Sequence, residues 1–158
     1  MSVAPCQRIV SERWSRTSEL AVRNEPRLIA IVDDDDSVRE ATKALIRSIG
    51  LVAEAFPSGE DFLRSSQLSR TTCLVTDINM PGTSGLELHH WVAALPESIP
   101  TILITAYPDE SVRERALSAG IVCYLVKPFG EDELLDCIAT AVGHAAGGGG
   151  AGSLTACR

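Results

Sequence analysis

The chain has 158 residues, which fits one domain of ordinary size, and its 45% hydrophobic content excludes a disordered protein. A net charge of −7 disfavours nucleic-acid binding, because affinity for nucleic acid rests on neutralising phosphates with lysine and arginine. No apolar run approaches the length of a transmembrane helix, and the N-terminus lacks the continuous apolar stretch of a secretory signal. We therefore expect a cytoplasmic protein that contacts neither membrane nor nucleic acid.

The cysteines and histidines show no metal-binding or disulfide pattern. The five cysteines lack C-x-x-C spacing, and three of them fall inside apolar segments. We expect reduced cysteines in the core rather than zinc ligands or disulfides. The adjacent His89 and His90 would point to different sides of a helix, and we expect exposed or partly buried rings there.

The N-terminal segment lacks apolar periodicity. Residues 1–26 are mixed and polar and contain Pro5 and Pro26, which predicts a flexible extension. A small excess of arginine over glutamate leaves a second interpretation open, in which the segment is a basic arm that contacts a partner.

Five short apolar runs predict buried β-strands. They occupy residues 28–32, 51–56, 73–77, 101–105 and 121–126. A helical pattern follows each run. In the helix predicted after the first run, Ser37 and Glu40 form the capping-box pattern S-V-R-E, and Gly50 stops the helix. The other helices are predicted from about residue 58, and over 86–95, 109–119 and 131–142.

This alternation of strand and helix, repeated five times, predicts a doubly wound α/β fold. A parallel five-stranded sheet would be covered by helices on both faces. Because crossover connections are right-handed, the carboxyl ends of all five strands would share one edge. The domain is predicted over residues 27–143, and the glycine-rich sequence AAGGGGAGS predicts a flexible tail over 144–158.

Polar residues lie at the expected carboxyl ends of four strands. Asp33 and Asp34 follow the first strand, and Asp77 ends the third. Thr105 ends the fourth strand, and Lys127 follows the fifth. Three converging carboxylates repel one another, at a cost on the order of 4 kcal/mol for each close pair. A divalent cation would remove that cost, and carboxylate oxygens in a site open to water suit Mg²⁺.

Such a site suits phosphoryl transfer to a carboxylate. Asp77 would attack phosphorus and form an aspartyl phosphate. Mg²⁺ would bridge Asp77 and the incoming group, and Lys127 would place its charge on another phosphoryl oxygen. Thr105 would donate a hydrogen bond to a third oxygen. Positioning and charge neutralisation are what this reaction mainly requires.

The chain resembles the receiver domains of bacterial two-component response regulators. The segments that carry the resemblance are, in order, IVDDDDSVRE, LVTDINMPGTSG, LITA and YLVKPF. The spacings also agree, with 43 residues from Asp34 to Asp77, 28 from Asp77 to Thr105 and 22 from Thr105 to Lys127. The resemblance covers residues 27–143 and is closest to FixJ-like receivers.

The resemblance implies a flavodoxin-like (βα)5 three-layer sandwich with strand order 2-1-3-4-5. It also implies that Asp77 is the phosphoacceptor. Asp33 and Asp34 match the acidic pair that holds Mg²⁺, and Asn79 matches the residue whose main-chain carbonyl binds the metal.

The remaining matched residues imply a switch. Thr105 and Lys127 match the hydroxyl and ammonium groups that sense the phosphoryl group, and Tyr124 matches an aromatic residue that turns inward when the threonine moves. The implied partners are a sensor histidine kinase and a downstream protein that binds the face of the fourth helix, fifth strand and fifth helix. A phosphorylation-dependent homodimer is the alternative use of that face.

We predict a stand-alone receiver that is a signalling module and not an enzyme. One alternative is the receiver part of a truncated transcription regulator of the LuxR or FixJ type. A second is a phosphatase with an aspartyl nucleophile, but those enzymes place an acidic residue two positions after the nucleophile, where this chain has Asn79. A flavodoxin-like cofactor-binding protein is a third alternative, and it is disfavoured because four aspartates after the first strand would repel a phosphate.

Overall fold

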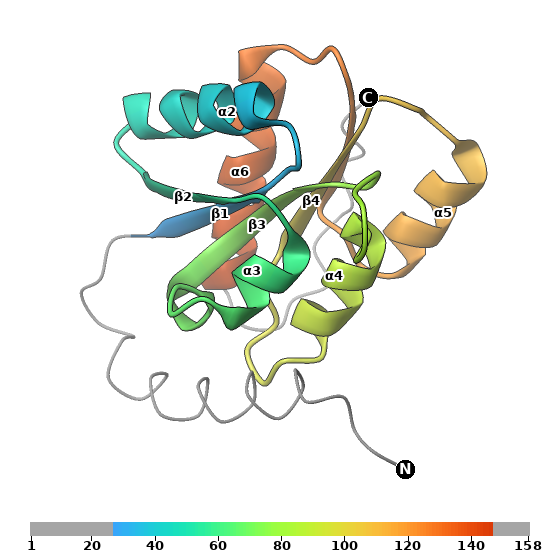
Figure 1. The fold of residues 1–158 in the computed structure, drawn as a ribbon, viewed down its shortest axis with the longest axis horizontal. Helices are drawn as coiled ribbons and strands as arrows, with labels where there is room; N and C mark the ends of the chain where they lie inside the picture. Colours follow the sequence, from blue (N-terminus) through green and yellow to red (C-terminus); the bar gives the residue numbers. More distant parts are fainter. Residues whose placement is uncertain (1–26, 147–158) are drawn as a thin grey trace.

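A five-stranded parallel sheet forms the centre of the molecule (Figure 1). The computed structural model describes residues 27–146. The strands are β1 Leu28–Val32, β2 Val52–Phe56, β3 Thr71–Asp77, β4 Thr101–Thr105 and β5 Cys123–Val126. All neighbouring pairs are parallel, in the order β2-β1-β3-β4-β5. The predicted fold class and strand order are confirmed.

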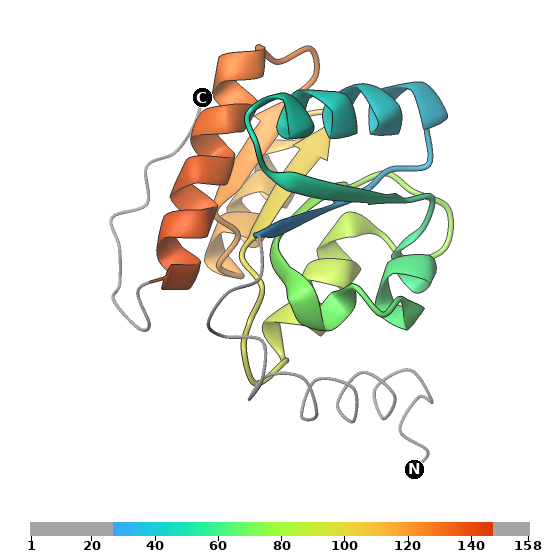
Figure 2. The same ribbon diagram turned by 90° about the vertical axis from the view of Figure 1, so that its left-hand side faces the viewer.

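Helices cover both faces of the sheet. The helical segments are α2 Asp36–Ser48, α3 Gly59–Arg64, the 3₁₀ turn Leu68–Arg70, α4 Gly85–Ala93, α5 Glu110–Ser118 and α6 Glu131–Ala146. Helices α2 and α6 lie on one face, and α3, α4 and α5 lie on the other (Figure 1, Figure 2). This arrangement is the three-layer sandwich expected when every connection between parallel strands is a helical crossover.

The core is mainly aliphatic on both faces of the sheet. Ile46 of α2 and Ile138 of α6 pack against inward side chains of the central strands. On the other face, Phe62 of α3 and Leu88 of α4 pack against the sheet. Every residue of β1 and β4 is buried, as expected for parallel strands covered on both sides.

The predicted boundaries of β1 and β4 are confirmed, and those of other elements shift. Strand β3 begins at Thr71, before the apolar run that predicted it, because Thr71 pairs with Leu28 of β1. Strand β5 begins only at Cys123, and α6 continues to Ala146. Polar residues extend a strand when a neighbouring strand offers main-chain partners, and apolar periodicity alone does not detect this.

The predicted capping box at Ser37 is wrong. Asp35 is the N-cap of α2, and its Oδ1 accepts hydrogen bonds from the main-chain N–H groups of Ser37 at 2.9 Å and Val38 at 3.1 Å. Aspartate caps a helix as well as serine does, so the aspartate run itself starts the helix. A capping box is present instead at the start of α4, between Ser84 and Glu87.

Three cysteines lie in the core as predicted. Cys73, Cys123 and Cys137 are all buried. Burial raises the pKa of the Cys73 thiol above its ordinary value, so this thiol stays protonated and unreactive.

The predicted N-terminal extension and most of the predicted tail lie outside the described residues. The structure does not describe residues 1–26 and 147–158, so the division of the chain at residues 26 and 143 stays a prediction. Over the part that the structure describes, no helix is both long enough and apolar enough to cross a membrane.

Candidate functional site

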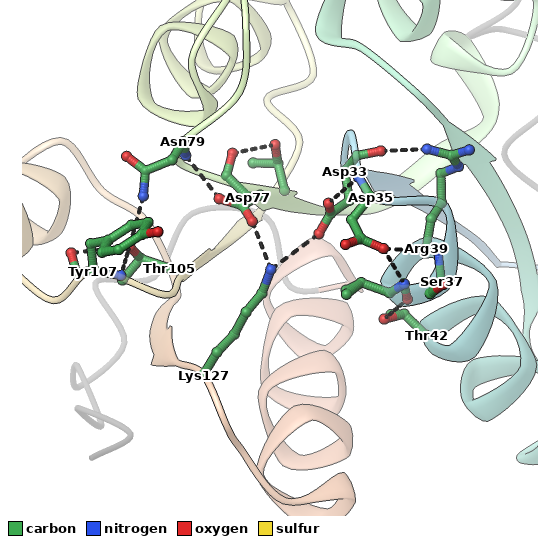
Figure 3. Close-up of polar contacts among 12 residues, drawn as sticks. Asp33, Asp35, Ser37, Arg39, Thr42, Asp77, Asn79, Thr105, Tyr107 and Lys127 are labelled. Atoms are coloured by element: carbon green, nitrogen blue, oxygen red, sulfur yellow. Dashed lines mark hydrogen bonds and ion pairs between the residues drawn. The ribbon is translucent and has the colours of Figure 1, made fainter.

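The carboxyl edge of the sheet gathers polar side chains from four neighbouring strands. Asp33 follows β1 and Asp77 ends β3, while Thr105 ends β4 and Lys127 follows β5. In Figure 3 the side chain of Lys127 reaches between Asp33 and Asp77. Residues that are far apart in the sequence are therefore brought together where the parallel strands end, which is the edge where ligands bind in open α/β sheets.

The ammonium group of Lys127 lies between two buried carboxylates. Its Nζ donates to Oδ2 of Asp77 at 2.7 Å and to Oδ2 of Asp33 at 3.4 Å. Asp33 is 4% exposed and Asp77 is 7% exposed. Two buried like charges destabilise a fold unless a cation compensates them, and Lys127 supplies that cation here.

This arrangement changes the titration of Asp33 and Lys127. Burial raises the pKa of Asp33 above its ordinary value, although the N–H of Asp35 and the charge of Lys127 act in the opposite direction. Burial alone would lower the pKa of Lys127, but its hydrogen bond to Asp77 and the charges of both aspartates outweigh burial and raise it. Lys127 is therefore a cation throughout the physiological pH range.

The donor set suits a hard divalent cation. Oδ2 of Asp33 and Oδ2 of Asp77 converge on one point, which Nζ of Lys127 occupies. Mg²⁺ uses one or two carboxylates and completes its shell with water and phosphate oxygens. No group of three or more His, Cys, Asp and Glu side chains in the described residues is placed to hold a metal. The structure thus brings together two carboxylates rather than the predicted three.

Asp34 stands apart from that pair. It is exposed, as are Asp35 and Asp36. Of the acidic pair Asp33 and Asp34, only Asp33 forms an ion pair with Lys127 among the described residues. The role of Asp34 as a metal ligand stays a prediction.

Arg39 of α2 is a site residue that sequence analysis missed. Its Nη1 donates to the main-chain carbonyl of Asp33 at 2.7 Å, and its Nη2 contacts the carboxylate of Asp36. Arg39 therefore holds the chain in place where β1 ends. The signal that could have identified it is an arginine one helical turn after an acidic run.

A hydrogen-bonded chain joins Asp77 to the end of β4. The N–H of Asn79 donates to Oδ1 of Asp77 at 2.8 Å, and Nδ2 of Asn79 donates to Oγ1 of Thr105 at 3.1 Å. Oγ1 of Thr105 also accepts from the N–H of Tyr107 at 3.0 Å and lies 3.1 Å from its carbonyl oxygen. The side chain of Asn79 thus positions Thr105, a role that the sequence did not indicate.

Tyr124 is buried beneath the start of α5. The ring packs in a cluster with Leu103, Ala116 and Ile121. Its hydroxyl oxygen accepts a long hydrogen bond of 3.5 Å from the N–H of Asp109, the N-cap of α5. Tyr124 therefore connects β5 to the segment that follows Thr105.

The expectation for His89 is wrong, because the ring is only 3% exposed. Its Nε2–H donates to the carbonyl of Ala119 at 2.9 Å, while Nδ1 is buried without a partner among the described residues. Burial lowers the pKa of His89 below its ordinary value, so the ring is neutral. His89 therefore joins α4 to the end of α5, and the neighbouring His90 is exposed as expected.

Comparisons with known proteins identify relatives over most of the chain. Residues 29–139 match the family described as the response regulator receiver domain. The response regulator protein TodT of Pseudomonas putida is 38% identical over 138 residues, which cover 87% of this chain and 57% of TodT. The transcriptional regulatory protein FixJ of Azorhizobium caulinodans is 32% identical, and the match covers 75% of this chain and 56% of FixJ.

A solved structure shows the same fold. The crystal structure of FixJ-N superimposes with a TM-score of 0.69 at 32% identity, covering 77% of this chain and 97% of that one. The chain spans little more than half the length of the two curated relatives named above.

Proposed function

Because this chain belongs to the receiver-domain family of two-component response regulators, we propose that Asp77 accepts a phosphoryl group from a sensor histidine kinase in the cytoplasm. The observation that carries the proposal is the contact of 2.7 Å between Nζ of Lys127 and Oδ2 of Asp77, at an edge shared with Asp33. A receiver domain is a signalling module rather than an enzyme. The proposed chemistry is therefore limited to the gain and loss of a phosphoryl group on Asp77 of the chain itself.

In the proposed step, a carboxylate oxygen of Asp77 attacks the phosphorus atom of a phosphohistidine. A P–O bond forms, the P–N bond breaks with its electron pair on the imidazole, and that ring takes up a proton from solvent. Lys127 would move its hydrogen bond from Asp77 to a phosphoryl oxygen and offset the added negative charge. Because Lys127 is already in place, little rearrangement is needed as charge develops.

Mg²⁺ is the proposed cofactor. The carboxylates of Asp33, Asp34 and Asp77 and the main-chain carbonyl of Asn79 would hold it. When bound, Mg²⁺ neutralises charge on the transferring phosphoryl oxygens. Asp33 and Asp77 support this assignment because they are buried side by side, whereas Asp34 would have to turn in from its exposed position.

Incubation with acetyl phosphate should add one phosphoryl group to the parent protein, detected by intact mass, and only when Mg²⁺ is present. The variant Asp77→Asn removes the nucleophile and should show no adduct. An adduct of equal amount on Asp77→Asn would overturn the proposal. No adduct on a folded parent that binds Mg²⁺ would indicate a receiver that works by protein contact alone.

The proposed readout begins at Thr105. Its Oγ1 is bonded to Asn79 and Tyr107, so a phosphoryl group on Asp77 would compete for that hydroxyl. A shift of Thr105 would free the chain above Tyr124 and move the start of α5, whose cap the Tyr124 hydroxyl contacts. Phosphorylation thereby biases a local two-state element.

Tyr124→Ala should keep the phosphoryl adduct but lose the change in amide hydrogen exchange that phosphorylation produces in α5 and β5. The reason is that a small side chain leaves the start of α5 uncoupled from β5. Exchange followed by mass spectrometry would measure this effect. Tyr107→Ala removes the other tyrosine of the chain, which is 76% exposed, and should behave as the parent does. A full exchange response in Tyr124→Ala would refute the role of this ring.

We propose the face of α5, β5 and α6 as the docking surface for a downstream protein or for a phosphorylation-dependent homodimer. Tyr107 and Val126 support this choice, because both are exposed large apolar side chains beside these elements. A second candidate function is the control of transcription within a longer regulator. It is favoured by the 56% coverage of FixJ, whose name describes a transcriptional regulatory protein. Size measurements with and without phosphorylation would separate a homodimer from a monomer that docks on another protein.

A further inference from the structure

Glu60, in the first turn of α3, is hydrogen-bonded to the loop of residues 78–84, which follows β3 and its proposed phosphoacceptor Asp77. Its Oε1 accepts from Oγ1 of Thr83 at 2.5 Å and from the N–H of Thr83 at 3.2 Å. These residues are 23 positions apart in the chain. The hydrogen bond from the Thr83 hydroxyl lowers the pKa of Glu60 below its ordinary value, so the acceptor is a carboxylate. Hydrogen bonds to a charged acceptor are stronger than those between neutral groups.

The loop also approaches the Glu60 carboxylate closely at Gly82. This glycine has a φ of +77°, and a Cβ atom placed on it would lie 3.2 Å from Oε1 of Glu60. Both the conformation and the space therefore favour glycine at this position. The main chain of the loop passes directly against the carboxylate before it reaches Thr83.

This loop also has hydrogen bonds at its two ends, and Met80 between them packs against the core. At its start, the N–H of Asn79 is bonded to Asp77, and the side chain of Asn79 is bonded to Thr105. At its far end, the capping box of Ser84 and Glu87 begins α4. Glu60 holds the segment just before that cap from a different helix, so it limits how far the whole loop can swing.

We propose that Glu60 is a positioning residue for the loop of residues 78–84, in which Asn79 would offer its main-chain carbonyl to the metal site beside Asp33 and Asp77. This inference rests on the proposed function, in which Asn79 contributes that carbonyl to the site. Glu60 is not among the residues proposed to react or to hold the metal. Its effect passes through Thr83 and the main chain of the loop.

Replacing a residue that orients a metal ligand typically weakens metal binding by about 10- to 100-fold. We expect Glu60→Ala to be near the lower end and to bind Mg²⁺ about tenfold more weakly, since Glu60 acts from several residues away. Calorimetric titration with MgCl₂ alone would measure the dissociation constant. Hydrogen exchange at the Thr83 amide, measured without Mg²⁺, should also become faster because its acceptor is gone.

Three further variants separate the hydrogen bond from charge and from general stability. Glu60→Gln keeps an acceptor oxygen and should bind Mg²⁺ nearly as the parent does. Asp61→Ala removes an equal charge from the same helical turn and should leave the dissociation constant unchanged. The double variant of Glu60→Ala with Thr83→Val should be no weaker than Glu60→Ala, because both changes break the same contact.

Parent-like Mg²⁺ affinity in Glu60→Ala would overturn the inference while leaving the proposed function intact. Equal weakening in Glu60→Ala, Glu60→Gln and Asp61→Ala would also overturn it, since a general charge effect would then explain the result. If the folded parent itself fails to bind Mg²⁺, the proposed function fails, and the role of Glu60 fails with it.

Discussion

Replacing Gly85 with alanine is expected to lower the free energy of unfolding by about 3 kcal/mol, because an added methyl group has no room at this position. A Cβ atom on Gly85 would lie 2.3 Å from the carbonyl oxygen of Asp77 and 2.9 Å from its carbonyl carbon. The obstacle is main chain, which cannot rotate away as a flexible side chain would. The start of α4 and the end of β3 must therefore separate.

The same substitution should impair phosphoryl acceptance, since the chain that moves is that of Asp77 itself. Thermal unfolding and the rate of adduct formation with acetyl phosphate would measure the two effects. Gly143→Ala is the matched control, because Gly143 lies in α6 and, apart from the backbone of its own helix, no atom of the described residues lies within 4 Å of the added Cβ. That variant should be as stable as the parent or slightly more stable, since alanine favours a helix over glycine. A Gly85→Ala protein that melts at the parent temperature would contradict the close contact.

Replacing Lys127 with methionine is expected to destabilise the protein by about 2 kcal/mol at pH 7 without divalent cations. Methionine keeps most of the length of the side chain but removes the charge between Asp33 and Asp77. Two buried carboxylates then repel one another without compensation. Mg²⁺ in excess should recover part of the loss, because a bound cation would offset the charges of Asp33 and Asp77.

The stability difference between Lys127→Met and the parent should shrink as the pH falls. The pKa of Asp33 is already raised by burial, and it rises further when the charge of Lys127 is removed. An acid whose pKa is higher in the folded state loses stability as the pH rises through that pKa, so protonation at low pH relieves the variant. Chemical denaturation at several pH values would measure this trend.

Lys43→Met supplies the control for that experiment. Lys43 lies on α2 and is the only other lysine of the chain. Its replacement should change stability by less than about 0.5 kcal/mol, as is usual away from buried charges. A Lys127→Met protein as stable as Lys43→Met, at every pH and Mg²⁺ concentration, would show that the two aspartates do not need the ammonium group.

The fold could be predicted almost completely because its signals are local. Most strands are short apolar runs, and helices α2 and α5 end just before a glycine stop signal, Gly50 and Gly120, both of which have positive φ angles. The misplaced elements are those whose limits depend on neighbours. Strand β3 begins early because β1 offers Thr71 a partner, and α2 begins early because Asp35 rather than Ser37 caps it.

The site could be predicted only as a set of strand ends. Consecutive residues at the end of a strand point to opposite sides, so the side chains of Asp33 and Asp34 do not point into the site in the same way. The sequence does not say which of the two side chains points into it. The bond from Asn79 to Thr105 spans 26 positions, and that from Glu60 to Thr83 spans 23. Such contacts depend on the tertiary arrangement of segments that lie far apart in the sequence. The periodicity of apolar residues does not predict that arrangement.

The distance along the chain between the charges of the site has a consequence for synthesis on the ribosome. Lys127 lies 94 positions after Asp33 and 50 after Asp77. Both carboxylates are therefore synthesised well before their cation is made. A nascent chain that stops before β5 lacks the ammonium group that compensates them, however well β1 and β3 have paired. Under the proposed role of Lys127, phosphoryl acceptance therefore requires that translation has passed the end of β5.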